Sequence, residues 1–114
     1  MHELSVCQGL VNEVARVAAA HGASRVTRIA VAVGPLSGVE APLLERAFAV
    51  ARAGTVADAA VLVTEATEVA VWCESCGAET VTAPNRLVCE RCGGWRVEVR
   101  RGAELLLTSI DIED

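Results

Sequence analysis

The chain has 114 residues, of which 53% are hydrophobic, and it carries a formal net charge of −5 at pH 7. This length allows one compact unit with a small satellite, and this composition suffices for a hydrophobic core. All 10 basic residues are arginine, and an acidic chain without a lysine-rich run is a poor nucleic-acid binder. No apolar stretch reaches membrane-spanning length without a charged residue, so a soluble protein with no membrane contact is expected.

The amino-terminal third of the chain predicts a helix followed by a strand. A capping box at Ser5–Gln8 and apolar residues at helical spacing predict a helix from about Val6 to His21. The next run, Val26–Val33, is β-branched and largely apolar, and it ends at Gly34-Pro35. It therefore predicts a buried strand.

The remainder of the chain predicts one more helix and two more strands. Pro42 suits the first turn of a helix whose apolar face runs to Ala51 before Gly54 ends it. The stretch Ala60–Val71 alternates imperfectly between apolar and polar residues and predicts a strand that leads into a cysteine-rich region. The last strand is predicted at Glu104–Ile110.

These elements predict an α+β fold. The order of strand, helix and strand between Val26 and Val71 implies a parallel pair with a right-handed crossover. The last strand is expected to return antiparallel beside the second, which gives two helices on a three-stranded mixed sheet. A small zinc-ribbon-like module is inserted late in this unit. The predicted domains are an α/β domain at 1–70 with 101–114 and a metal-binding module at 71–100.

The cysteine spacing is the strongest chemical signal in the chain. Two C-x-x-C pairs are separated by 12 residues and consist of Cys73, Cys76, Cys89 and Cys92. A glycine follows each pair, where the turn around a metal-bound sulfur needs a positive φ. Four thiolates satisfy a tetrahedral zinc ion and leave no open position, so the pattern predicts a structural site rather than a catalytic one.

Two other readings of the cysteines stay open. The pairs could form disulfides, but the chain begins at Met1 without an apolar signal-peptide stretch, so a reducing cytosol is expected. Iron in a rubredoxin-like site is the other metallic reading, since four thiolates suit either ion. The segment from about Trp72 to Val99 is too short to be held by burial alone, which favours a metal there.

The amino terminus is the second chemical feature. His2 can offer its imidazole and its amide nitrogen together with the terminal amine of Met1, and the amide of Glu3 can complete a planar set. Planar nitrogen ligation suits Ni(II) or Cu(II) rather than zinc. Taken alone this signal is weak, because a histidine near a terminus is usually just solvated.

The whole chain resembles one known family. Met1–Ser5 opens a helix, Gly34–Val39 precedes a second helix with Ala47-Phe48, two C-x-x-C-G pairs follow, and Gly102–Leu107 lies near the end. In this joint order the motifs are similar to those of the HypA/HybF family of hydrogenase nickel-incorporation proteins.

The resemblance implies a cytoplasmic nickel metallochaperone that is not an enzyme. Such a protein helps to insert nickel into the large subunit of [NiFe]-hydrogenases with the GTPase HypB. The resemblance implies a nickel cargo site at Met1, His2 and Glu3, with His2 as the side-chain ligand, and a structural zinc site at the four cysteines. It leaves open whether the protein forms a homodimer.

The runner-up function is a zinc-ribbon adaptor that binds a protein or nucleic acid. Against nucleic acid, the three arginines of the cysteine-rich segment are offset by four glutamates. Other residues have ordinary explanations: Cys7 is expected to be a small buried side chain, His21 to suit a helix C-terminus, and Glu40 to be a solvated carboxylate rather than a partner contact.

Overall fold

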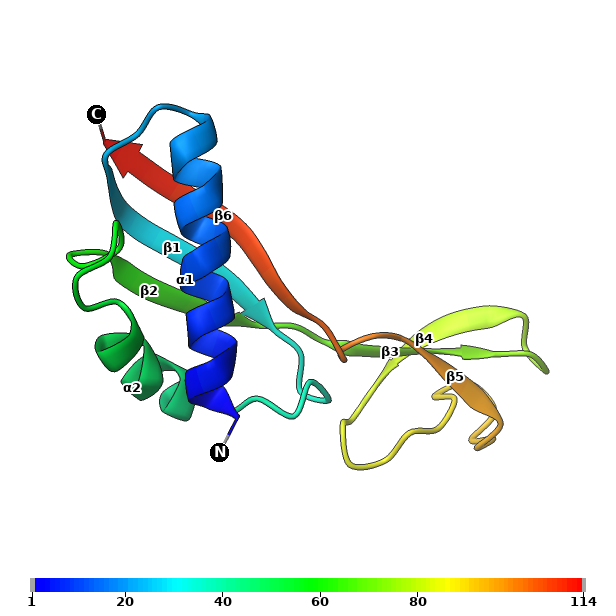
Figure 1. The fold of residues 1–114 in the computed structure, drawn as a ribbon. Coiled ribbons are helices and arrows are strands. Elements are labelled where there is room, and N and C mark those ends of the chain that lie inside the picture. The colour runs from blue at the N-terminus through cyan, green and yellow to red at the C-terminus, as the bar shows by residue number, and fades with distance from the viewer. Residues whose placement is uncertain (1, 114) are drawn as a thin grey trace.

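The computed structural model describes residues 2–113, which form two helices and six strands in two separate three-stranded sheets. The elements are α1 (Glu3–Ala20), β1 (Arg25–Val33), α2 (Ala41–Ala51), β2 (Val61–Ala66), β3 (Val69–Cys73), β4 (Ala78–Thr82), β5 (Val97–Arg101) and β6 (Leu105–Glu113). The molecule is elongated, with principal extents of 52 × 29 × 16 Å, and one sheet lies at each end (Figure 1). No helix within residues 2–113 combines the length and the apolar character needed to cross a bilayer.

The first sheet has the strand order β2-β1-β6, and both helices pack on the same face of it (Figure 1). Strand β1 pairs parallel with β2 and antiparallel with β6. The predicted class, two helices on a three-stranded mixed sheet, is confirmed. The predicted place of the last strand is wrong, because β6 lies beside β1 and not beside β2. The physical reason is that β1 is buried along most of its length and therefore takes the central position.

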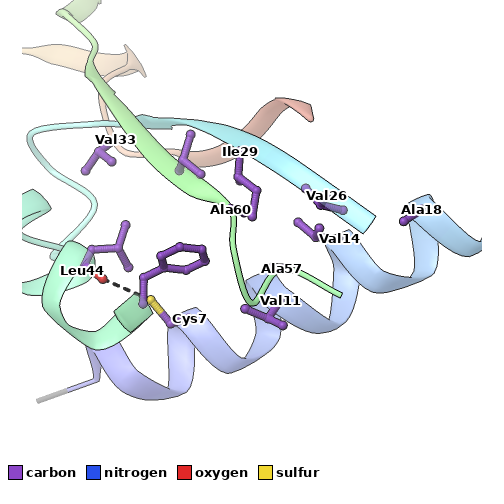
Figure 2. Close-up of a cluster of buried hydrophobic side chains, with 12 residues drawn as sticks. Cys7, Val11, Val14, Ala18, Val26, Ile29, Val33, Leu44, Ala57 and Ala60 are labelled. Carbon is purple, nitrogen blue, oxygen red and sulfur yellow. Dashed lines mark hydrogen bonds between the residues drawn. The ribbon is translucent and has the colours of Figure 1, made fainter. Parts of the chain in front are cut away.

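The hydrophobic core lies between this sheet and the two helices. Figure 2 shows side chains of both helices and of β1 converging there. Cys7, Val14, Ile29 and Leu44 are each 0% exposed. The thiol of Cys7 donates to the Leu44 carbonyl oxygen at 3.3 Å. Cys7 is thus a small buried residue that ties α1 to α2, as the sequence predicts.

Helix α1 starts earlier than predicted. Its N-cap is His2, which makes no side-chain capping bond, so the capping box predicted at Ser5–Gln8 is wrong. The Val6 amide already donates to the His2 carbonyl oxygen at 2.9 Å. Glu3 lies in the first turn, where the free amides of a helix favour a carboxylate. The helix therefore uses the very first residues of the described chain.

The stretch Ala60–Val71, predicted as one strand, is two strands that belong to different sheets. Strand β2 ends at Ala66 and β3 begins at Val69. The Thr67 amide still donates to the Val33 carbonyl oxygen at 3.2 Å, which continues the ladder between β1 and β2, and the chain leaves the first sheet after this residue. Strand β6 also runs three residues beyond the predicted end at Ile110, because its pairing with β1 continues to Glu113.

The second sheet has the order β4-β3-β5 and is antiparallel throughout. It joins the first sheet where Gly34 and Gly102 meet: a Cβ on Gly34 would overlap the Gly102 carbonyl oxygen. Gly102 itself has φ +109°, which favours glycine, and a Cβ there would lie 2.8 Å from the Val69 Cγ2 atom. The division of the chain into two domains at residues 71 and 100 stays a prediction.

Replacing Gly34 by alanine should lower the free energy of unfolding by roughly 1–3 kcal/mol, as expected for overpacking a tight backbone contact. Gly9→Ala is the matched control, because a Cβ at this helical position meets nothing within 4 Å. That change should be neutral or should stabilise by up to about 1 kcal/mol. Urea unfolding of both variants, followed by circular dichroism, checks this expectation. Equal destabilisation by the two changes would contradict the close contact.

Candidate metal centres

The structure brings the four cysteines of the two C-x-x-C pairs together on the second sheet. Cys73 ends β3, Cys76 lies in the turn to β4, and Cys89 and Cys92 lie in the long connection between β4 and β5. Their sulfur atoms all lie within 4.8 Å of one another. Among residues 2–113 this is the one group of three or more cysteine, histidine or acidic residues positioned to hold a metal ion.

The sulfur separations fit a tetrahedral zinc ion. With zinc–sulfur bonds of about 2.3 Å, neighbouring sulfurs of a regular tetrahedron lie about 3.8 Å apart. The Cys73 and Cys92 sulfurs are 3.8 Å apart, and so are those of Cys76 and Cys89. Cys73 and Cys89 are buried, Cys76 is half-buried and Cys92 is exposed. The donor set therefore fits a closed site with one ligand at its outer edge.

Each C-x-x-C pair lies in a tight turn closed by the glycine that follows it. Gly77 has φ +60°, and its amide donates to the Cys73 carbonyl oxygen at 2.8 Å. Gly93 has φ +73°, and its amide donates to the Cys89 carbonyl oxygen at 2.7 Å. The predicted positive φ after each pair is confirmed. The two turns have the same backbone geometry, and their sulfur atoms face a common centre.

The crowded sulfurs have opposed acidities. Hydrogen bonding to the sulfurs of Cys92 and then Cys89 raises the pKa of Cys76 to about 12. The backbone amide of Cys92, followed by that of Arg91, lowers the pKa of Cys89 to about 6. Sulfurs this close share protons unless a cation compensates their charge. A divalent ion at the centre would hold all four as thiolates, so metal binding must release protons.

The second candidate centre is the amino terminus, on the first sheet's side of the molecule. Met1 lies outside the described residues, so the terminal amine is not placed. His2 is exposed and has φ −89° and ψ −4°. The angle ψ describes rotation about the Cα–C bond of His2. A value near zero places the amide nitrogens of His2 and Glu3 on the same side of this bond. In this conformation the two nitrogens could close a five-membered chelate ring around one ion.

These two amides are also outside the hydrogen-bond ladder of α1. Its first donor is the Val6 amide, which bonds the His2 carbonyl oxygen. The first amides of any helix lack intrahelical partners. A metal ion could therefore replace the amide proton of His2 without breaking the helix, whereas replacing that of Glu3 would also break the hydrogen bond from this amide to the Glu3 carboxylate.

The side chain of Glu3 has a role that sequence reasoning missed. It is only 7% exposed, although it lies next to the exposed His2. The backbone amide of Glu3 itself, followed by that of Glu40, holds the pKa of this carboxyl below its usual value. The carboxylate is thus directed at the N-cap of α2 and anchors the amino terminus there. An acidic residue in the first turn was the available signal, but its partner is 37 positions away in the sequence.

Replacing Cys73 by serine should abolish tight zinc binding and unfold the second sheet, because it removes a ligand that the small sheet needs. The first sheet should stay folded, since its core contains none of these cysteines. Cys7→Ala is the control: it removes a cysteine that lies outside the cluster and should leave the zinc content unchanged. Zinc analysis and amide NMR spectra of both variants make the measurement. Full zinc content in the Cys73 variant would contradict the assignment.

Comparisons with known proteins find matches that extend over almost the whole chain. The family model described as "Hydrogenase/urease nickel incorporation, metallochaperone, hypA" matches residues 1–112. A protein of Nitrosospira multiformis named hydrogenase maturation factor HypA is 42% identical over 112 residues, which cover 98% of this chain and 97% of that protein. A protein of the same name from Aquifex aeolicus is 35% identical and covers 99% of this chain and 98% of its own length.

Solved structures show the same fold. The solution structure of the Ni metallochaperone HypA from Helicobacter pylori superimposes with a TM-score of 0.75 at 28% identity, and the match covers 98% of this chain and 97% of that one. A second structure, described as the solution structure of HypA protein, gives a TM-score of 0.77 at 28% identity over 99% and 97% of the two chains.

Proposed function

This chain belongs to the HypA family of nickel metallochaperones for hydrogenase maturation, and from that premise we propose that it carries Ni(II) at its own amino terminus. It passes this cargo to the large subunit of [NiFe]-hydrogenase, in cooperation with a GTPase of the HypB type. It acts as a carrier rather than an enzyme. The resemblance found in the sequence is confirmed by the family match.

The observation that carries the nickel site is the backbone conformation of His2. Its ψ of −4° already aligns the amide nitrogens of His2 and Glu3 for chelation. Neither amide takes part in the α1 ladder, although the Glu3 amide bonds the carboxylate of its own residue, and the imidazole is on an exposed residue. With the amine of Met1 and the imidazole, these nitrogens supply the planar set that suits Ni(II). An exposed site of this kind lets a partner remove the ion without unfolding the core.

We assign the four-cysteine cluster to structural zinc. Its sulfur separations suit a tetrahedral ion, and the closed ligand set leaves no position for a substrate. When bound, the ion would supply the links that a sheet of five-residue strands lacks. A site of four reduced thiolates persists where thiols are kept reduced, so we place the protein in the cytoplasm.

We assign the GTPase to the helical end of the molecule. A shallow, mostly apolar depression of about 160 Å³ lies beside the amino terminus and is lined by Glu3, Leu4, Leu43 and Ala47. Leu4 is 42% exposed and Leu43 is 38% exposed. An apolar contact there would hold a partner next to His2, where nickel must enter or leave. The cysteine-bearing sheet is then left for the hydrogenase subunit.

Replacing His2 by alanine should abolish stoichiometric nickel binding and leave zinc content and fold intact, because the exposed terminus contributes little packing. The chain offers a matched control in His21→Ala, since His21 is the other histidine and its imidazole bonds the Val17 carbonyl oxygen of the same helix. Nickel titration of the zinc-loaded variants by calorimetry measures the effect. Full nickel affinity in the His2 variant would show that the site is elsewhere.

A second version of this titration tests the terminal amine. Extra residues placed before Met1 should weaken nickel binding strongly, because they remove the amine from the chelate. Equal binding with and without the extension would contradict the terminal chelate, whatever the result for His2.

Acidification should release nickel before zinc. Protons compete directly for exposed nitrogen ligands, whereas four thiolates hold zinc inside a folded site. Measuring both metals on one zinc-loaded and nickel-loaded sample during a stepwise fall in pH gives the order of release. Zinc that leaves first would mean that the nickel ligands are not protonatable terminal nitrogens.

A further inference from the structure

The two sheets are joined by two short chain crossings, one through residues 67–68 between β2 and β3 and one through residues 102–104 between β5 and β6. Figure 1 shows both crossings at the narrow middle of the molecule. A pair of short linkers usually permits relative motion of the parts that they connect. The contacts made by these crossings decide whether this occurs here.

The carboxyl end of β1 is bound to both crossings through the backbone. The Gly34 amide donates to the Glu104 carbonyl oxygen at 2.8 Å, and the Leu36 amide donates to the Gly102 carbonyl oxygen at 2.7 Å. The Thr67 amide donates to the Val33 carbonyl oxygen at 3.2 Å. The carboxyl end of the central strand of the first sheet therefore holds both segments that lead to the second sheet.

The side chain of Glu104 ties the two crossings to each other. One carboxylate oxygen accepts the Gly102 amide at 2.7 Å, and the other accepts the Thr67 hydroxyl at 3.3 Å. The backbone amides of Glu104 itself and of Gly102 hold the pKa of this carboxyl below its usual value. The group is then charged at neutral pH, and hydrogen bonds to a charged acceptor are stronger than neutral ones.

The backbone segments at the same place are closely packed. The backbone of Gly34 touches that of Gly102 so closely that a Cβ would not fit. On its other side Gly102 faces Val69, at the start of β3, where an added Cβ would lie 2.9 Å from the Cα atom. Three backbone segments are therefore stacked in contact at the junction.

The junction also leads to the amino terminus. The loop that begins at Gly34 is held through Leu36 and ends at Glu40, the N-cap of α2. The Glu40 amide faces the Glu3 carboxylate, next to His2. One short loop, residues 34–40, thus contacts the junction between the two sheets at its first end and the anchored amino-terminal segment at its other end.

We propose that Glu104 is a positioning residue whose carboxylate locks the two crossings together, so that the cysteine-bearing sheet and the amino terminus are held as one rigid body. The inference rests on the proposed function only in that it takes the amino terminus as the nickel site. Its consequence is that the protein presents nickel at a fixed distance and orientation from the cysteine-bearing sheet, which a client can recognise together with the ion.

The test compares rotational tumbling of the two sheets by ¹⁵N relaxation in the zinc-loaded full chain. In the unmodified protein, amides of β1 and β3 should share one correlation time. In Glu104→Ala they should lose it, with the second sheet tumbling faster, while zinc content and the signals within each sheet are kept. Glu104→Gln, which retains an acceptor for the Gly102 amide, should restore most of the common correlation time. Glu68→Ala is the matched control, because it removes an exposed carboxylate from the same crossing.

Separate correlation times in the unmodified protein, or a common one in Glu104→Ala, would overturn the lock. If Glu104→Ala does not fold, Thr67→Val carries the test, since it removes one bond to Glu104 and should loosen the junction in the same direction. Nickel affinity of Glu104→Ala should be unchanged, while nickel transfer to the hydrogenase large subunit should slow. Unchanged transfer with a loosened junction would overturn the positioning role. Absence of nickel binding in the unmodified protein would instead count against the proposed function and would leave the tumbling result intact.

Discussion

The second sheet of this structure depends on four sulfur atoms that lie close enough together to bind one metal ion. Strands β3, β4 and β5 have only five residues each, and sheets this small do not bury enough apolar surface to stay folded alone. The cysteines of the two turns lie at the end where all three strands would otherwise separate. Ligation of one ion there would replace the core that the sheet lacks, and the buried residues of this sheet include Cys73 and Cys89 themselves.

The first sheet and its two helices are held together by a buried hydrophobic core. This difference between the two sheets suits the task of a metal carrier. Helices α1 and α2 and strand β1 make a core without metal ligands. Nickel at the proposed terminal site could therefore arrive and leave without unfolding this core. Beside the proposed nickel site, the carboxylate of Glu3 fixes the start of α1 against α2 and leaves the neighbouring His2 exposed.

Local patterns in the sequence predicted the local parts of this structure. The periodicity of α2, the apolar run of β1, and the glycines after each cysteine pair all depend on neighbouring residues, and they were predicted correctly. One error was local, since the capping box at Ser5–Gln8 placed the start of α1 too late. The other errors concern partners distant in the sequence. The pairing of β6 depends on which edge of β1 is available, and the break of one predicted strand into β2 and β3 lies where the chain passes from the first sheet to the second.

The candidate sites were likewise predictable only where they depend on residues close together in the sequence. The cysteine cluster could be predicted because spacing alone reveals it, whereas the contacts of Glu104 and Glu3 could not. Each of these carboxylates is held by hydrogen bonds from backbone amides. The amide partners of Glu104 include the nearby Gly102 and Ala103, but its hydroxyl partner Thr67 is 37 positions away in the sequence. No periodicity or motif signals a bond of that kind.

The elongated shape, 52 Å in its longest dimension, has a kinetic consequence. With the amino terminus on one sheet and the cysteines on the other, two proteins can occupy the carrier at once without competing for the same surface. Under the proposed function, the ion would then move inside a ternary assembly, where the effective concentration of the acceptor is set by geometry rather than by its abundance. The rigid junction that we propose would fix that geometry, so free nickel need never accumulate in the surrounding solution.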